Sequence, residues 1–370
     1  MSDLPPLTIG IEEEYQIVDP KTGELKSSIC RLLETGKLIL REQLQPELHQ
    51  SQVEIGTKVC ETPAEAREEL VRLRQAVMAL AARDGLKIAA AGTHPFSSWS
   101  DQEVTPFDRY LGIAEDMQLV AQRLLTFGTH VHIGIEDPEL RIAVMNAARA
   151  MLPQLLCLTT SSPFWIGQTT GFKSYRGIVF GDLPRHGIPP TFGSEAEFQG
   201  LVDTLVKTHC IPDGSKIYWD VRPHFKFPTL EFRICDVTTR VDEAACVAAI
   251  FQALVAKLAN LRSAGLSLPI YPSILIEENK WRAMRYGLDG NLIDLATERE
   301  RPARELIGEL IEDFLVDAID ELGTRSEIAY AYRIMDEGTS ADRQLATYQR
   351  TGDLHAVVAQ LIQETEEGVL

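Results

Sequence analysis

Acidic, imidazole and guanidinium side chains recur in this sequence at alternate positions of short segments. Three pairs of such residues are separated by one residue: Glu12 and Glu14, His130 and His132, and Glu231 and Arg233. Two carboxylates directed into one cavity repel each other unless a cation lies between them. Carboxylate oxygens favour Mg²⁺ or Mn²⁺, imidazoles are frequent metal ligands, and the planar arginine side chain binds phosphate oxygens bidentately. The pattern indicates a metal site beside a phosphate site.

Each pair also has a purely structural interpretation when it is taken alone. The glutamates could belong to an acidic edge strand, the histidines could be hydrogen-bonded core residues, and Glu231 with Arg233 could form a cross-strand salt bridge. Gly128 and Gly134 flank the histidine segment and favour a functional role, because glycine lets a ligand approach the backbone.

Two further arginines lie in segments flanked by glycine or proline. Arg176 follows Ser174-Tyr175, and Arg222 stands in Asp220-Val221-Arg222-Pro223. Either could bind a substrate carboxylate, and the alternative for each is an ordinary surface arginine.

Strands with a period of two must present these side chains. Five segments alternate in this way: 8–18, 52–56, 128–135, 217–222 and 229–234. In the first, Glu12 and Glu14 share one face while Ile11 and Tyr15 take the other. One face of the sheet is therefore apolar and needs a cover of helices, and the opposite face carries charge. The prediction is an α+β fold in which an antiparallel or mixed sheet, backed by helices, lines a charged cavity.

Helix starts are marked by capping residues followed by proline. Thr62-Pro63 with Glu65 opens a helix that ends near Gly85, and Thr105-Pro106, Asp137-Pro138 and Ser194 with Glu197 predict three more starts. Residues 242–262 are apolar on nearly every face, which predicts a central helix. Helices follow one another after Pro302. No repeat or linker divides the chain, so one domain is predicted for residues 1–370, with a helical C-terminal portion.

The composition limits the classes of function. The 370 residues include 54 acidic and 36 basic side chains, which gives a formal net charge of −18. Nucleic acids and anionic membrane surfaces need basic partners and are not expected here. The uncharged stretch 150–172 contains Pro153 and a polar end, so buried core followed by a loop is predicted there. Residues 1–6 lack the features of a signal peptide, and a cytoplasmic location is expected.

Motifs of other classes are missing or incomplete. The six cysteines form no CxxC pair, so a structural zinc site is not expected and most should be small core residues. Segment 167–174 differs from a P-loop, because only three residues separate its glycines and Phe172 displaces Lys173. No GxGxxG, HExxH or GxSxG motif occurs. Lys173 is kept, with Arg233, as a predicted nucleotide-binding residue.

Taken in order, several segments resemble the carboxylate–amine ligase family, the type 2 glutamate–cysteine ligases. The matching segments are 8–16, 46–55, 128–134, 161–165, 219–223, 230–233 and 338–343. No single segment is decisive, but the ordered set is specific and covers most of the chain. Thr129 departs from the family pattern, which has a bulkier apolar residue before the first histidine, and this could alter the fit of the substrate.

The resemblance implies a fold similar to that of glutamine synthetase, in which a curved antiparallel sheet forms the cavity. It implies ATP and two or three Mg²⁺ ions (with Mn²⁺ as an alternative) as cofactors, held by Glu12, Glu14, Glu47, Glu54, His130 and Glu231. Arg233 would contact the transferred phosphate, and His132, Arg176 and Arg222 would line the substrate side. The implied partners are small-molecule substrates, an amino-acid carboxylate and an amine, and a homodimer is implied at the level of the family.

The implied reaction forms an amide bond through an acyl phosphate, with glutamate as the acid and cysteine or another amine as the nucleophile. The loops near 160–190 would exclude water from that intermediate. One alternative is a metal-dependent hydrolase that uses the His130–His132 pair and the carboxylates. Such enzymes often add further histidines, and no second HxH occurs. Another alternative is an inactive relative that serves as a binding or scaffold protein.

Overall fold

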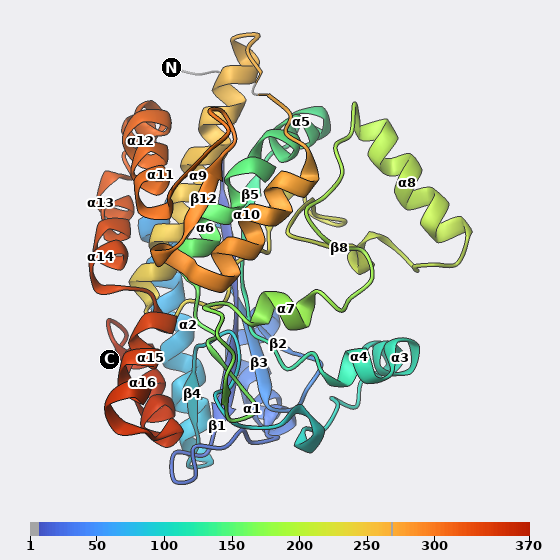
Figure 1. Ribbon diagram of the computed structural model, residues 1–370. Coiled ribbons are helices and arrows are strands. Elements are labelled where there is room, and N and C mark those ends of the chain that lie inside the picture. The colour runs from blue at the N-terminus through green and yellow to red at the C-terminus, as the bar shows by residue number, and fades with distance from the viewer. Residues whose placement is uncertain (1–6, 268) are drawn as a thin grey trace.

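An antiparallel sheet forms the centre of the molecule. The computed structural model describes residues 7–267 and 269–370 (Figure 1), so the predicted absence of a signal peptide in segment 1–6 concerns residues outside that range. The strands are ordered β10-β11-β5-β1-β3-β2, and β4 also pairs with β1. Their bounds are β1 Ile9–Val18, β2 Leu44–Pro46, β3 Gln52–Gly56, β4 Lys87–Ala89, β5 Thr129–Gly134, β10 Val221–Pro223 and β11 Thr229–Phe232. The predicted α+β class with an antiparallel sheet backed by helices is confirmed.

Four of the five predicted strands occur close to their expected bounds, and the fifth prediction, 217–222, is wrong as a single strand. Tyr218–Trp219 (β9) pairs in parallel with His186–Gly187 (β8), whereas β10 joins the main sheet. The break falls at Asp220, whose backbone N–H donates to Gly187 and whose carbonyl accepts from Arg233. Because its two backbone groups bond to different elements, no continuous ladder can pass through this residue.

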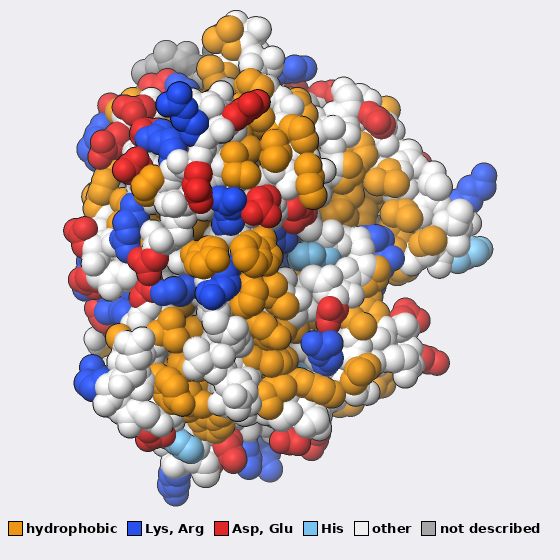
Figure 2. All heavy atoms as spheres, viewed as in Figure 1, with side chains coloured by type: hydrophobic (Ala, Val, Ile, Leu, Met, Phe, Trp, Pro, Cys, Tyr) orange, Lys and Arg blue, Asp and Glu red, His pale blue; other side chains and the backbone are white. Residues whose placement is uncertain are grey.

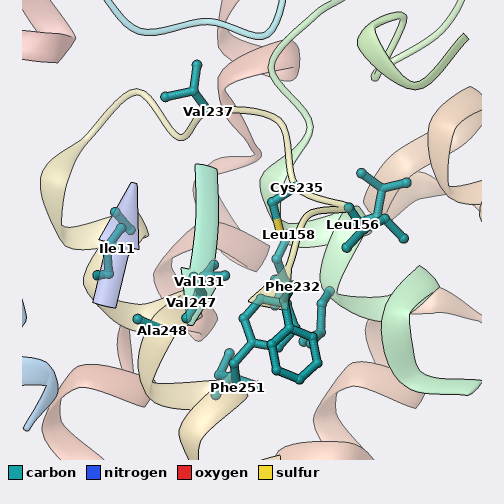
Figure 3. Close-up of a cluster of buried hydrophobic side chains, with 14 of the residues drawn as sticks. Ile11, Val131, Leu156, Leu158, Phe232, Cys235, Val237, Val247, Ala248 and Phe251 are labelled. Carbon is teal, nitrogen blue, oxygen red and sulfur yellow. The ribbon is translucent and has the colours of Figure 1, made fainter. Parts of the chain in front are cut away.

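The apolar face of the sheet packs against the long helix α9 (Val241–Ser263), as the all-apolar segment predicts. Figure 3 shows Ile11, Val131 and Phe232 from three neighbouring strands beside Val247 and other side chains of α9. The rings of Phe232 and Phe251 stack with centroids 4.1 Å apart. This layer buries the alternate strand residues, so the remaining residues of the same strands face the opposite side.

Three of the four predicted helix starts are confirmed. Thr62, Asp137 and Ser194 each accept a backbone N–H at the start of α2 (Pro63–Arg83), α5 (Pro138–Ala148) and α8 (Glu195–Lys207). The start predicted at Thr105-Pro106 is wrong, because α3 covers Asp108–Met117. The hydroxyl of Thr105 donates to the carbonyl of Glu47, at 2.6 Å, and this contact ties Thr105 to the end of β2, while Phe107 is the residue that precedes the helix.

The remaining helices complete the cover, and those after Pro302 form a C-terminal layer as expected (Figure 1). They are α1 Ile29–Leu40, α4 Leu119–Gln122, α6 Leu152–Thr159, α7 Arg176–Phe180, α10 Ser273–Tyr286, α11 Ala303–Glu309, α12 Val316–Leu322, α13 Arg325–Ile328, α14 Tyr330–Glu337, α15 Ser340–Thr351 and α16 Leu354–Glu366. Two short hairpins are formed by β6 Phe164–Trp165 with β7 Gln168–Thr169 and by β12 Asn291–Asp294 with β13 Arg299–Pro302.

Two helical stretches, Pro138–Thr159 and Val241–Ser263, have the length and apolar composition of a membrane span, but most of each is buried in the described structure, as in any core helix. The uncharged segment 150–172 consists of the buried helix α6 followed by loop and hairpin residues, as predicted. All six cysteines are free, and four of them are buried while Cys210 is exposed.

A buried ion pair fastens the sheet to α2. Glu13 lies on the apolar face between Ile11 and Tyr15, and its carboxylate is 2.6 Å from the Arg74 guanidinium, with both side chains fully buried. Arg74 also donates to the carbonyls of Thr238 and Thr239, and to the hydroxyl of Tyr15. Every strong donor of this arginine is therefore satisfied without water, which is the condition for a buried charge to be tolerated.

Replacing one partner of this pair should destabilise the protein strongly. Arg74→Met keeps most of the volume but leaves the Glu13 carboxylate buried and unpaired, so the free energy of unfolding should fall by about 3–5 kcal/mol. Adding Glu13→Gln should recover part of the loss. Urea unfolding measures both effects. The control is Arg325→Ala, which removes an exposed pair with Asp320 and should change stability by less than about 1 kcal/mol. Equal losses of unfolding free energy in Arg74→Met and Arg325→Ala would contradict the structural role assigned to the Glu13–Arg74 pair.

Candidate active site

The polar face of the sheet opens into a cavity of about 290 Å³. Most of the residues predicted from the sequence to carry chemistry line it: Glu12, Glu14, Glu47, Glu54, His130, Arg176, Arg222, Glu231 and Arg233. They come from the five strands β1, β3, β5, β10 and β11, from the residues that follow β2 and β11, and from the start of α7. Strand alternation and the apolar cover on the other face together account for their common orientation.

The strand register brings the polar residues opposite one another. Glu14 on β1 is opposite Glu54 on β3, and Glu12 is opposite His130 on β5. Glu231 on β11 has His132 on one side and Arg222 on the other. Directly opposed residues of an antiparallel pair point to the same face with their Cβ atoms close together, so the register itself assembles the cluster.

Two groups of potential metal ligands result. The carboxylates of Glu14, Glu47 and Glu54 form one group, and Glu12, His132 and Glu231 form the other; within each, the ligand atoms lie within 4.8 Å of one another. The first group offers only hard oxygen donors, which suits Mg²⁺ or Mn²⁺, and the second adds one imidazole nitrogen. The two groups adjoin because Glu12 and Glu14 are alternate residues of one strand.

Both histidines contact the Glu12 carboxylate. His132, predicted for the substrate side, has Nε2 3.4 Å from a Glu12 oxygen and belongs to the second ligand group. His130, predicted as a ligand, has Nδ1 3.3 Å from the other Glu12 oxygen, and its buried Nε2 has no hydrogen-bond partner among the described residues. Burial and the nearby Arg233 charge lower the pKa of His130 to about 4, so its ring is neutral and keeps a lone pair for a ligand.

The carboxylates fall into two electrostatic classes. Burial and then the charge of Glu47 raise the pKa of Glu14 to about 8, and burial with the charges of Glu12 and Glu47 raises the pKa of Glu54 well above its ordinary value. For Glu12, burial acts in the same direction, but the contacts with His132 and His130 outweigh it and hold the pKa well below the usual range. Arg176 and Arg233 act on Glu14 only at longer range, so among the described residues the group that contains Glu14 and Glu54 is the one without a direct ion pair to a basic side chain.

Glu231 is neutralised by two arginines. The Nε and Nη2 atoms of Arg222 lie 2.7 and 3.3 Å from its two oxygens, and Arg233 pairs with the same carboxylate. These positive charges outweigh burial and keep the pKa of Glu231 well below its ordinary value. The Nε of Arg233 is buried and has no partner among the described residues, so this side chain can still donate to an anion in the cavity.

Arg176 reaches the cavity by passing over Gly128. A Cβ atom added to Gly128 would lie 2.5 Å from the guanidinium, so only glycine fits there. Gly134 likewise leaves room for the Thr8 hydroxyl, because a Cβ atom added to Gly134 would lie 2.4 Å from the Thr8 Oγ1. The expectation that these glycines admit a ligand is wrong, since protein side chains fill both spaces.

A buried carboxylate organises the loop that precedes Arg176. Asp236 accepts hydrogen bonds from the backbone N–H of Ser161 and from the hydroxyls of Ser162 and Ser174, at 2.7–2.9 Å. The Ser162 hydroxyl also accepts the backbone N–H of Arg176, at 3.0 Å. The segment with Ser161-Ser162 is thus a support for Arg176 rather than a direct part of the cavity wall.

Lys173 is not brought together with the other predicted residues. Its ammonium pairs with Asp342 and lies 3.5 Å from Asp289, on the side of the C-terminal helices, and it does not line the cavity. The ammonium is already neutralised by these two acids, so its position does not favour the predicted contact with a nucleotide.

Several residues that line the cavity were not singled out from the sequence: Arg109, Tyr110, Lys216, Tyr218 and His224. His224 directly follows a matched segment, and Tyr218 belongs to a predicted strand, so these two carried a signal of position. Arg109 and Lys216 lie in a helix and a 3₁₀ turn far apart in the sequence, and no spacing rule connects them.

Comparison with known proteins gives one consistent family. The sequence profile of glutamate–cysteine ligase family 2 matches residues 8–360. A protein of Roseiflexus castenholzii with the name "Putative glutamate--cysteine ligase 2" is 56% identical over 364 residues, which cover 98% of this chain and 96% of that protein. A protein of the same name from Solibacter usitatus is 51% identical over 366 residues, 99% of this chain and 95% of its own.

Solved structures share the fold at low sequence identity. A bifunctional glutathione synthetase from Pasteurella multocida superposes with a TM-score of 0.72 and 16% identity, over 98% of this chain and 52% of that longer one. A glutamate–cysteine ligase from Francisella tularensis, in complex with AMP, gives a TM-score of 0.68 and 12% identity over 98% and 90% of the two chains. These similarities establish a common architecture.

The raised pKa values predict that metal binding releases protons. Below pH 8 the Glu14 carboxyl is protonated in the metal-free protein, and a metal ligand must be ionised, so Mn²⁺ or Mg²⁺ should displace on the order of one proton at pH 7. Metal affinity should rise between pH 6.5 and 8.5. Calorimetric titration in two buffers of different ionisation enthalpy measures both quantities. Glu14→Gln should reduce the proton release to the part contributed by Glu54, and a pH-independent affinity of the unmodified protein would refute the assignment.

Proposed function

This chain belongs to glutamate–cysteine ligase family 2, and we propose that it is an ATP- and Mg²⁺-dependent carboxylate–amine ligase that forms an amide bond through an acyl phosphate. The observation that carries the proposal is the pairing, in one cavity, of two adjoining acidic ligand groups with arginines whose guanidinium groups border them. Acids that bind cations and arginines that bind anions are what a phosphoryl transfer between two anionic substrates requires.

The donor set fits magnesium. Glu14, Glu47 and Glu54 supply only oxygens, two of them on residues whose raised pKa values show that a positive charge is needed there. Glu12, His132 and Glu231 form the second set, with His130 beside them. Bound Mg²⁺ would neutralise the charge of the ATP phosphates and of the transferred group.

The proposed reaction needs no nucleophile from the protein. An oxygen of the substrate carboxylate attacks the γ-phosphorus of ATP, and ADP leaves with the electrons of the broken P–O bond. The amine then attacks the acyl carbon, loses a proton, and releases phosphate that keeps one oxygen of the original carboxylate. Arg233, whose Nε is free to donate, would hold the transferred phosphoryl group, while Arg222 orients Glu231.

Water must be kept from the acyl phosphate, which it would hydrolyse. The segment after Arg176 contributes Phe180 and Leu183 to the cavity wall, next to the guanidinium that lies 5.3 Å from the Phe180 ring centre. The prediction that the loops near 160–190 cover the reacting groups is therefore part of the proposal.

Glutamate, through its γ-carboxyl, and cysteine or another amine are the proposed substrates, in keeping with the names of the relatives. The cytoplasmic location and the homodimer expected from the sequence also remain part of this proposal. Mixing the protein with ATP, Mg²⁺, glutamate and a panel of amines should release ADP in amounts that depend on both organic substrates.

Isotope transfer tests the intermediate. Glutamate labelled with ¹⁸O in the γ-carboxyl should pass one labelled oxygen to the released phosphate, detected by mass spectrometry or by the ³¹P isotope shift. Phosphate without label, together with ADP release, would exclude the acyl phosphate. Turnover with metal but without nucleotide would favour the hydrolase instead, and failure to bind ATP or to react with any pair of substrates would leave the binding-protein alternative.

Replacing Glu54 should change activity and stability in opposite directions. Because its carboxyl is buried among like charges, Glu54→Gln should raise the melting temperature of the metal-free protein while it lowers kcat/KM by on the order of 100-fold through loss of a metal ligand. Glu61→Gln, at an exposed position before α2, is the control and should change neither quantity. Full activity of Glu54→Gln would contradict its place among the ligands.

A further inference from the structure

The outer part of the cavity carries positive charge that has no counterion. Arg109 and Lys216 both line the cavity, and neither side chain makes an ion pair or a hydrogen bond within the described part of the chain. This differs from Arg222 and Arg233, which share the Glu231 carboxylate. Asp213 and Asp116 act on Lys216 only at longer range.

Arg109 is held at the cavity by its neighbour. It lies in the first turn of α3, and Tyr110 anchors this helix because its hydroxyl donates to the Pro46 carbonyl at the end of β2. Tyr110 also packs with Leu48 and Ala121 in a small hydrophobic cluster separate from the main core. A positive side chain in the first turn is unfavourable to the helix dipole, so stability of α3 does not explain its presence there.

Lys216 ends a 3₁₀ turn (Gly214–Lys216) that is fixed on both sides. Arg222 donates to the carbonyl of Ser215, at 3.1 Å, and Arg185 donates to the carbonyl of Lys216, at 3.0 Å. The backbone is thus tied to the sheet while the ammonium stays unpaired. Arg109 and Lys216 line the same cavity, and burial and then the charge of Arg109 lower the pKa of Lys216.

Tyr218 lines the same cavity as Arg109, Lys216, Arg222 and Arg233. The charges of Arg185 and of these three arginines all act on Tyr218. In Figure 2 the surface is indented at the right-hand edge, between the parts that belong to α8 and to α3–α4. An anionic group in the outer part would meet two unpaired cations within one continuous cavity.

We propose that Arg109 and Lys216 form a subsite for a substrate carboxylate that does not take part in the reaction. The inference rests on the proposed ligase function and defines its substrate class as molecules that keep a free carboxylate away from the reacting group. Such a carboxylate offsets the repulsion between the two cations and replaces their hydration with charge-assisted hydrogen bonds.

Two sources could supply that carboxylate, namely the acid that is activated or the amine that attacks. Matched substrates separate them. 4-Aminobutyrate is glutamate without its α-carboxylate and keeps the reacting carboxyl, and cysteamine is cysteine without its carboxylate. The ratio of kcat/KM within each pair measures the contribution of the carboxylate on that substrate alone.

The test compares these ratios in Arg109→Gln and Lys216→Gln with those of the unmodified protein. The unmodified protein should prefer the carboxylate-bearing member of one pair, and each variant should reduce that preference by about 10- to 100-fold, mainly through KM. Arg123→Gln is the matched control. Arg123 is a cation in a neighbouring segment, but it pairs with Asp182 and does not line the cavity. Its ratios should stay unchanged.

Other outcomes would overturn the subsite. If the unmodified protein shows no preference for a carboxylate-bearing substrate, or if both variants keep that preference, Arg109 and Lys216 are only solvated surface cations. An equal loss with every substrate, together with a raised KM for ATP, would assign them to the nucleotide phosphates. If no substrate pair supports ADP release, the ligase proposal itself fails. The subsite is then tested by calorimetric binding of glutamate, 4-aminobutyrate, cysteine and cysteamine to the free protein, which measures whether the variants lose affinity for a carboxylate.

Discussion

Five carboxylates share one face of a sheet, and their mutual repulsion is the constraint to which the rest of the site responds. In a low-dielectric cavity this repulsion must be relieved by a cation, by a proton or by a basic side chain. The protein uses different means in its two halves. Glu231 and Glu12 have arginine or histidine partners, whereas Glu14 and Glu54 have raised pKa values and rely on a proton until a metal arrives. The half in which the described residues form no direct ion pair with a basic side chain is therefore the half whose charge a divalent cation would balance.

This crowding is tolerated because the opposite face of the same strands is very firmly held. Ile11, Val131 and Phe232 pack on α9, and Glu13 is fixed by the fully buried Arg74. A strand that slipped by one residue would exchange these faces, burying the metal ligands and exposing the apolar side chains. The stability of the apolar layer is thus what keeps an unfavourable cluster of like charges in register.

The sequence predicted the parts of this arrangement that follow from periodicity. Alternation along 8–18 and 128–135 placed Glu12, Glu14, His130 and His132 on one face, and capping residues located three helix starts. It could not predict which strands pair, so the position of His132 beside Glu12 and Glu231 became visible only through the strand register.

Other errors arose where a tertiary contact overrides a local rule. Thr105 is bound to the residues after β2 through its hydroxyl and its backbone N–H, and Asp220 forms its backbone hydrogen bonds with two separate elements. The sequence around Gly128 indicated space for a ligand beside the backbone, but the guanidinium of Arg176 occupies that space. Each of these depends on a residue distant in sequence, which no local pattern contains.

The electrostatics of the cavity also explain how a strongly acidic chain can attract anionic substrates. Many acids of the C-terminal helices pair with nearby arginines or lysines, as in the Arg301–Glu309 and Lys257–Asp317 pairs, and Figure 2 shows the two signs interspersed there. The overall charge of −18 would slow the approach of ATP or an amino-acid carboxylate if it acted uniformly. Screening confines each charge to within about 10 Å at ordinary ionic strength, so the local sign at the cavity decides. Arg109 and Lys216 contribute positive charge to the cavity, and in the proposed reaction its acids would bind the metal that accompanies the phosphates.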